Sequence, residues 1–131
     1  MKYSILPQRL AVCRLAPDTE VKPSWLAGEF SAIVRTRDEL SIVCREDLVA
    51  KLGANAMAES GWTALKLEGP FPFAMTGVLA SFLQPLAEAR IPIFAISTFD
   101  TDYVLVKHDT VEQAVKVLDA AGHKRTDSRE V

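Results

Sequence analysis

The sequence has few of the residues on which catalysis and metal binding usually depend. Its 131 residues include two histidines, two cysteines and six glycines. Neither His108 nor His123 has a serine, cysteine or metal-ligating partner at a recognisable spacing, so we expect both to be exposed polar side chains. The sequence contains no Gly-rich phosphate loop and no spaced set of zinc ligands. It therefore predicts no cofactor, no metal ion, no catalytic residue and a protein that is not an enzyme.

Long apolar runs and a strong net charge are also missing. No run approaches the roughly 18 apolar residues of a membrane-spanning helix, and the apolar stretch before Pro7 is too short for a signal peptide. The net charge is -2, from 15 basic and 17 acidic residues, which gives no electrostatic case for a nucleic acid or membrane partner. Cys13 and Cys44 lie inside expected strands and outside any CxxC pattern, so we expect buried thiols and a cytoplasmic location.

The chain is apolar enough to fold, since 49% of its residues are hydrophobic. Alternating and helical apolar spacings predict strands at 3–15, 30–36, 40–46, 62–69, 91–98 and 102–107, and helices at 23–26, 46–53, 77–90 and 109–122. We expect 54–61 to be a linker, 70–73 a stiff loop and the charged tail 123–131 to be frayed. Thr76 is a predicted helix N-cap, and Pro85 is expected to kink or split the helix that follows.

The two halves of the chain resemble each other. Aligned without a gap, residues 32–48 match residues 95–111, with Ala32 opposite Ala95. The order strand, helix, strand, strand, helix recurs in both halves, although the opening helix of the first copy is much shortened. A split βαβ arrangement of this kind is typical of ferredoxin-like folds. We therefore predict an α+β fold of two ferredoxin-like (βαββαβ) subdomains, with antiparallel sheets and helices packed on one face.

The segment 97–102, Ser-Thr-Phe-Asp-Thr-Asp, joins two expected strands without a glycine. We interpret it as one side of a polar pocket whose other side is the start of the helix after Thr76. Unpaired N–H groups at a helix N-terminus suit a carboxylate, and Asp100 and Asp102 suit an ammonium group. The candidate ligand-binding residues are Thr76, Gly77, Val78, Leu79, Ser97, Thr98, Phe99, Asp100, Thr101 and Asp102.

The same residues also have plainer interpretations. Thr76 serves equally well as an ordinary helix cap, and the turn as a solvated hairpin. Phe99 either stacks on a ligand or fills the core. Asp100 is the better candidate for a carboxylate that faces the ligand. Asp102 borders a strand, and in the plainer interpretation it only caps the hairpin. Glu68, at a strand end, either faces the pocket or is solvated.

Three spaced segments, "WTALKLEGP", "TGVLAS" and "ISTFDTDYVLV", resemble the ACT-domain variant found in CASTOR-type arginine sensors and in small bacterial proteins. The resemblance covers 62–120 strongly and 8–50 weakly. It implies a tandem ACT protein with a degenerate N-terminal subdomain, 1–60, and a C-terminal ACT subdomain, 61–131. It further implies a non-catalytic regulator that binds a small ligand such as an amino acid and assembles as a homodimer.

Two other functions stay open on the residues alone. One is a structural homodimeric interaction module with a vestigial pocket, and the other is a small enzyme using Cys44 or the Asp100/Asp102 pair. The ligand side chain is equally open. Glu68 or Asp102 would suit arginine, and the aromatic rings would suit an apolar ligand; these are Phe71, Phe73 and Phe99. The first copy has Arg35 where the second has a Ser/Thr-Asp pattern, so we expect no equivalent second site.

Overall fold

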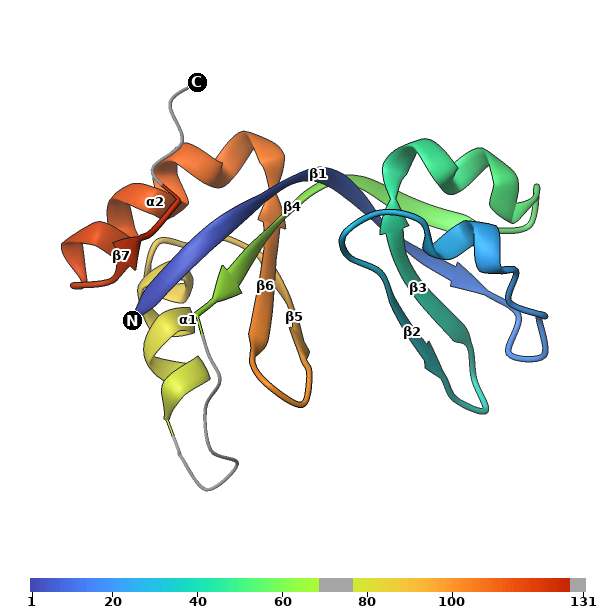
Figure 1. Ribbon diagram of the computed structural model, residues 1–131, viewed down its shortest axis with the longest axis horizontal. Coiled ribbons are helices and arrows are strands. Elements are labelled where there is room, and N and C mark those ends of the chain that lie inside the picture. Colours follow the sequence, from blue (N-terminus) through green and yellow to red (C-terminus); the bar gives the residue numbers. More distant parts are fainter. Residues whose placement is uncertain (69–76, 128–131) are drawn as a thin grey trace. The chain divides into compact units, whose positions relative to one another are not determined.

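The structure is a computed structural model and describes residues 1–68 and 77–127. Figure 1 shows its elements in chain order. The strands are β1 (Lys2–Leu15), β2 (Ala32–Arg35), β3 (Leu40–Arg45), β4 (Met57–Leu67), β5 (Ile93–Ser97), β6 (Asp102–Lys107) and β7 (Lys124–Arg125). The helices are α1 (Val78–Glu88) and α2 (Val111–Ala120), with short 3-10 helices η1 (Pro23–Leu26), η2 (Glu46–Leu52) and η3 (His108–Thr110). The predicted α+β class is confirmed.

The chain forms two compact units that do not follow one another simply along the sequence. The first unit is Gln8–Trp62, and the second combines Met1–Pro7 with Thr63–Val131. The division expected from the sequence placed all of the N-terminal strand in one subdomain. In the structure β1 passes from the second unit into the first, and β4 passes back again.

The first unit has the strand order β2-β3-β1-β4. β1 pairs antiparallel with β3 from Leu10↔Arg45 to Leu15↔Leu40, and β3 pairs antiparallel with β2. Counted within this unit, the order is second, third, first and fourth strand, as in a ferredoxin-like sheet. The two helical positions of the fold are held by η1 and η2, in agreement with the shortened opening helix that the sequence predicts.

In the second unit the order is β5-β6-β4-β1, with β7 added in parallel on β1. The later half of β4 is its first strand, followed by α1, β5, β6 and α2. The fourth position, which the strand after α2 takes in a simple βαββαβ chain, is held by the first residues of β1. The short β7 is displaced to the outside, where Lys2 pairs with Lys124 and Tyr3 with Arg125.

Each unit has its own hydrophobic core. The first core consists of Ala11, Cys13, Leu15, Trp25, Leu40, Ile42, Cys44, Leu48 and Leu52. The second core consists of Tyr3, Leu65, Leu67, Phe82, Leu86, Ile91, Val104, Val106, Ala114 and Leu118. Within β1, alternate residues from Ala11 onwards enter the first core, and Tyr3 enters the second, as a strand with a period of two residues requires.

Two expectations from the sequence are wrong. Residues 57–61 are the start of β4 and not a linker; this part of the strand is mostly exposed, so backbone pairing holds it and no apolar alternation marks it. The tail is not frayed over 123–127, because β7 pairs with β1. The expected split of the helix after Thr76 is also wrong, because Pro85 lies inside α1, which continues as one helix from Val78 to Glu88.

The internal repeat is present, one residue out of the predicted register. The β2–β3 hairpin closes with Arg35 opposite Leu40, and the β5–β6 hairpin closes with Ser97 opposite Asp102. The turn 36–39, Thr-Arg-Asp-Glu, therefore corresponds to the turn 98–101, Thr-Phe-Asp-Thr. Both turns share a Thr-x-Asp pattern, which the gapless alignment on alanine had hidden.

Candidate functional site

The turn between β5 and β6 is closed by the hydroxyl of Thr98. The Thr98 N–H donates to the Thr101 carbonyl at 2.8 Å. The Thr98 hydroxyl donates to the same carbonyl at 3.0 Å and accepts from the Thr101 N–H at 3.2 Å. Thr36 closes the β2–β3 turn in the same way, accepting from the N–H groups of Asp38 and Glu39. A threonine side chain thus supplies turn closure without glycine.

Two further bonds hold this turn in place. The Thr101 hydroxyl is buried and donates to the Leu67 carbonyl, at the end of β4, at 2.6 Å. The Ser97 hydroxyl donates to the Asp102 carboxylate across the mouth of the hairpin. Asp102 is therefore engaged within the hairpin, whereas Asp100 is exposed at its tip. Phe99 is 79% exposed, so the idea that it fills the core is wrong.

The predicted other side of the pocket is the start of α1. Its cap position is Gly77, with φ of 79°, a left-handed conformation that favours glycine. Val78 and Leu79 follow in the first turn, half-buried against the second core. The predicted cap, Thr76, lies outside the described residues. Gly77 has no side chain to cap the helix, so among the described residues no cap side chain bonds the first N–H groups of α1.

Both segments belong to the same end of the second unit. The turn 98–101 is bonded to Leu67, and α1 is the next described element of the chain after β4. In Figure 1 the start of α1 and the β5–β6 turn both point to the lower end of the view. The fold therefore places a helix N-terminus and the exposed Asp100 toward the same end of the second unit, where Thr101 bonds the last residue of β4.

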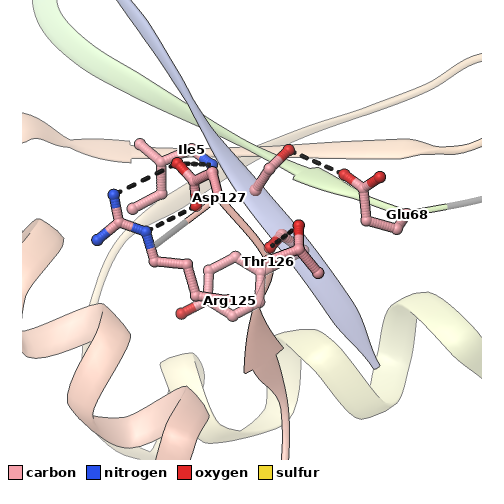
Figure 2. Close-up of polar contacts among 7 residues, drawn as sticks. Ile5, Glu68, Arg125, Thr126 and Asp127 are labelled. Atoms are coloured by element: carbon pink, nitrogen blue, oxygen red, sulfur yellow. Dashed lines mark hydrogen bonds and ion pairs between the residues drawn. The ribbon is translucent and has the colours of Figure 1, made fainter. Parts of the chain in front are cut away.

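Glu68 has a structural partner instead of being solvated. Its carboxylate accepts from the Ser4 hydroxyl at 2.8 Å, and its N–H donates to the Lys2 carbonyl at 2.9 Å. Figure 2 shows the hydrogen bond to the Glu68 carboxylate beside the contacts of residues 125–127. Glu68 thereby ties the end of β4 to β1.

Residues 125–127 form a polar cluster on β1 that no local sequence pattern predicts. Arg125 forms an ion pair with Asp127 at 2.8 Å, and the Ile5 N–H donates to the same carboxylate at 3.4 Å. The Thr126 N–H donates to the Tyr3 carbonyl at 2.7 Å, and the Thr126 hydroxyl donates to the same carbonyl at 3.2 Å (Figure 2). Burial works against a charge on Asp127, yet Arg125 and the Ile5 N–H hold the pKa of its carboxyl below the usual range.

One of the two histidines is not exposed, contrary to expectation. His123 is 7% exposed, and its Nε2 lies 3.2 Å from the Ser81 carbonyl oxygen. That carbonyl would bond the N–H of residue 85 in a regular helix, and Pro85 has none. The imidazole ring therefore replaces the hydrogen bond that proline removes. Burial lowers the pKa of His123, although the Ser81 carbonyl opposes this. His108, by contrast, is exposed and lies 2.9 Å from the Thr63 hydroxyl.

The two cysteines are free and buried, as predicted. Ala11 pairs with Cys44 and Cys13 with Ile42, so the thiols are diagonal neighbours on one face of the sheet. A hydrogen bond with Cys44, together with burial, raises the pKa of the Cys13 thiol. Within residues 1–68 and 77–127, no group of three or more His, Cys, Asp or Glu could hold a metal ion. The helices of these segments include none long and apolar enough to cross a membrane.

Comparisons with known proteins fit this geometry. A family model described as an ACT domain matches residues 57–120, and a second model, an N-terminal domain, matches residues 8–51. The human protein CASTOR3P is 28% identical over 119 residues, which cover 80% of this chain and 72% of that protein. The human cytosolic arginine sensor for mTORC1 subunit 1 is 29% identical over 108 residues. This match covers 79% of this chain but 32% of that sensor, so the chain spans about a third of its length.

Solved structures show the same fold. A protein from Agrobacterium tumefaciens is 36% identical, with a TM-score of 0.85, covering 95% of this chain and 91% of that one. The regulatory subunit of aspartate kinase from Thermus thermophilus is 12% identical, with a TM-score of 0.64, covering 92% of this chain and 97% of that one. The ferredoxin-like tandem arrangement predicted from the sequence is confirmed, and residues 57–120 of the chain belong to the ACT-domain family.

Proposed function

We propose that this protein is a non-catalytic regulatory module that binds a free amino acid at the end of the second unit. The ligand carboxylate would lie at Gly77, Val78 and Leu79, where no cap side chain of the described residues bonds the first N–H groups of α1. The ammonium group would meet the hairpin 97–102, with Asp100 as its main acceptor. Thr76, which the sequence analysis predicts to be part of this site, lies outside the described residues.

The observation that carries the proposal is the way the hairpin is fixed. Thr101 bonds the turn to β4, and Thr98 closes the turn on itself. Ser97 donates a hydrogen bond to Asp102. Asp100 is left exposed on a rigid turn at the same end of the sheet as the start of α1. A charged group held on a rigid element loses little conformational entropy on binding a ligand.

The relatives support a regulatory role for the chain. The arginine sensor and the aspartate kinase regulatory subunit are by name a cytosolic sensor and a regulatory protein. We propose that this chain likewise acts in the cytoplasm and, as a homodimer, transmits ligand binding through a change in assembly or partner contact. Arginine is the first ligand to test.

The test is a binding measurement with a matched control variant. The purified chain is screened by thermal shift against the twenty amino acids, and any ligand is followed by calorimetry. At about a hundredfold excess over Kd, binding stabilises the folded state by about 2.7 kcal/mol. Asp100→Ala should weaken binding by about 2–4 kcal/mol. Asp38→Ala changes the equivalent position of the β2–β3 turn and should leave affinity unchanged.

The result also decides between this proposal and its rivals. Equal affinity of Asp100→Ala and the unchanged protein would refute the role of Asp100. If none of the twenty amino acids shifts the melting temperature, the result would instead favour the interaction module with a vestigial pocket. The homodimer of such a module is measurable by sedimentation.

A further inference from the structure

A hollow lies within the first unit. It has a volume of about 290 Å³ and is lined by Gln8, Arg9, Arg45, Glu46 and Asp47. Sites for small molecules begin at about 300 Å³, so the hollow suits only a small ligand. Its origin is topological: the pairing of β1 with β3 ends at Leu10↔Arg45, and the chain then turns into η2. Gln8 and Arg9 continue along β1 past the end of β3, and the space opens there.

The hydrogen-bond donors of this hollow are only partly used. Arg45 donates from Nε and Nη2 to the two carboxylate oxygens of Asp47, at 2.9 Å and 2.6 Å, which leaves its Nη1 hydrogens available. The Oε1 of Gln8 accepts from the Glu29 N–H at 3.1 Å, so its amide Nε2 remains a donor. Arg9 is exposed and has no ion-pair partner among residues 1–68 and 77–127.

An acceptor is fixed beside these donors. Glu46 accepts the Gly61 N–H through Oε1 at 3.0 Å, which holds the carboxylate and leaves Oε2 for another group. The Gly28 backbone lies close to the side chains of Gln8 and Arg45. A Cβ at this position would lie 2.8 Å from the Arg45 Cδ and 2.9 Å from the Gln8 amide. The side chains of Gln8 and Arg45 are therefore packed against the Gly28 backbone instead of moving freely.

From this arrangement we infer that the first unit carries a second binding site, for a small zwitterion with a carboxylate and an ammonium group. Arg9, Gln8 Nε2 and Arg45 Nη1 bind the carboxylate, and Glu46 Oε2 with Asp47 binds the ammonium. Guanidinium–carboxylate contacts are among the stronger hydrogen bonds in proteins. The lining carries two positive and two negative side chains, so a neutral ligand with separated charges matches it better than a simple ion. The inference does not depend on the site proposed for the second unit.

Three probes separate the parts of the ligand: glycine has both charges, acetate only the carboxylate and methylamine only the ammonium. Each is titrated into the isotope-labelled full chain, and chemical shifts are followed for the Gln8 side-chain amide, the Arg9 and Arg45 side chains and the Gly61 N–H. We expect saturable shifts at these groups with glycine, and at least fivefold weaker apparent affinity for acetate and for methylamine. Equal response to acetate and glycine would overturn the assignment to a zwitterion.

Two variants test the residues. Arg9→Gln should weaken glycine binding about tenfold, since a charged hydrogen bond is lost, while Arg37→Gln removes an exposed arginine of the same unit and should have no effect. Glu46→Gln keeps an oxygen for the Gly61 N–H and removes only the charge, so it should preserve the fold and abolish the preference of the site for glycine over acetate. Unchanged binding in both Arg9→Gln and Glu46→Gln would overturn the proposal.

The location of the shifts keeps the two sites distinguishable. Shifts confined to Gly77–Leu79 and to the hairpin 97–102 would refute the second site and support the first. Shifts confined to the hollow, unaffected by Asp100→Ala, would do the reverse.

Discussion

At the level of single residues, threonine hydroxyls replace the glycine that a tight hairpin usually needs. Thr98 closes its turn by bonding both the N–H and the carbonyl of Thr101, and Thr36 has the same role in the first unit. Thr101 adds a bond to Leu67 outside the hairpin. These hydroxyls let the turn carry an aspartate and an aromatic ring at its tip without loss of order.

Removing the buried hydroxyl should destabilise the second unit. Thr101→Val leaves the Leu67 carbonyl without its donor at a position that is 7% exposed. We expect the free energy of unfolding in urea to fall by about 1–2 kcal/mol. Thr126→Val removes an exposed hydroxyl that donates to the Tyr3 carbonyl at 3.2 Å and should cost less than about 0.5 kcal/mol. Equal losses in the two variants would contradict this.

A second residue-scale feature is the pairing of a proline with a distant histidine. Pro85 frees the Ser81 carbonyl within α1, and His123 bonds it from beyond the end of α2. The ring also packs edge-on against Phe82, with 5.1 Å between centroids. Among residues 1–68 and 77–127, its buried Nδ1 has no hydrogen-bond partner. A proton added there would find no acceptor, so this site favours the neutral ring.

This histidine should make the folded state sensitive to mild acid. The unfolded chain binds a proton on His123 near its ordinary pKa of 6.5, whereas burial lowers the pKa of the folded ring. Its contribution to the free energy of unfolding is therefore complete above pH 6.5. It falls as the pH decreases towards the folded-state pKa, by at most about 1.4 kcal/mol per pH unit.

The measurement is urea unfolding at about pH 7.5 and about pH 5.5, a pair of conditions on either side of the ordinary histidine pKa. His123→Gln offers an N–H to the Ser81 carbonyl but does not titrate, so it should lose less stability between the two conditions than the unchanged protein. Exposed His108→Gln is the control and should behave as the unchanged protein does. Parallel losses in all three proteins would show that carboxylates, and not His123, govern this range.

At the level of elements, β7 is the least expected part of the fold. It has two residues, yet its segment is held to β1 by the Lys124 and Thr126 N–H groups and by the Asp127 carboxylate. It covers the edge of a strand that would otherwise present unpaired backbone groups, which are a risk for aggregation. The Arg125–Asp127 ion pair orients the carboxylate towards the Ile5 N–H (Figure 2).

Removing this carboxylate should release β7 without unfolding its unit. In Asp127→Ala, amide hydrogens of Lys124 and Thr126 should exchange at least about tenfold faster, since a bond to a charged acceptor is lost. Exchange at Leu65 and Val104 should not change, and Asp109→Ala, which removes an exposed carboxylate, should change neither. Because the pKa of Asp127 is lowered by folding, acid should mimic the variant. The contribution of Asp127 is present above about pH 4 and is lost as the pH falls through the folded-state value.

At the level of the whole molecule, two long strands serve both units. β1 supplies the fourth position of the second unit and the first strand of the first, and β4 has the converse arrangement. Different residues along β1 enter the two cores: Tyr3 lies in the second core and Ala11 lies in the first. The N-terminus is therefore part of a core that is otherwise formed by residues more than sixty positions later.

At this scale we predict that the first residues of β1 stabilise the second unit, most of which comes from the later half of the chain. Tyr3 is 1% exposed and lies edge-on to Phe82, with 5.4 Å between ring centroids. Tyr3→Ala should destabilise the unit of residues 63–127 by about 3–5 kcal/mol, as truncation of a buried aromatic ring does. Hydrogen exchange at Val104 and Val106 would report this loss. Val34→Ala, at a site 57% exposed, is the control, and equal exchange in both variants would contradict the shared-strand fold.

The positions of most elements could be predicted from local patterns. The strand 102–107 agrees with β6 at both ends, and the helical turn 23–26 agrees with η1, since apolar alternation and proline placement are local signals. Residues 57–61 and β7 could not be predicted in this way. Both are largely exposed, so their strand structure comes from backbone bonds to β1 and leaves no apolar pattern in the sequence.

The candidate site divides in the same manner. From the sequence alone we obtained the residue types, the repeat, the ACT resemblance and the polar hairpin, because each depends on neighbours along the chain. Tertiary structure decided the register of the repeat, the engagement of Asp102 and Glu68, the burial of His123 beside the helix that contains Pro85, and the sharing of β1 between units. Each of these depends on a partner distant in sequence or on hairpin pairing, which one-dimensional spacing does not record.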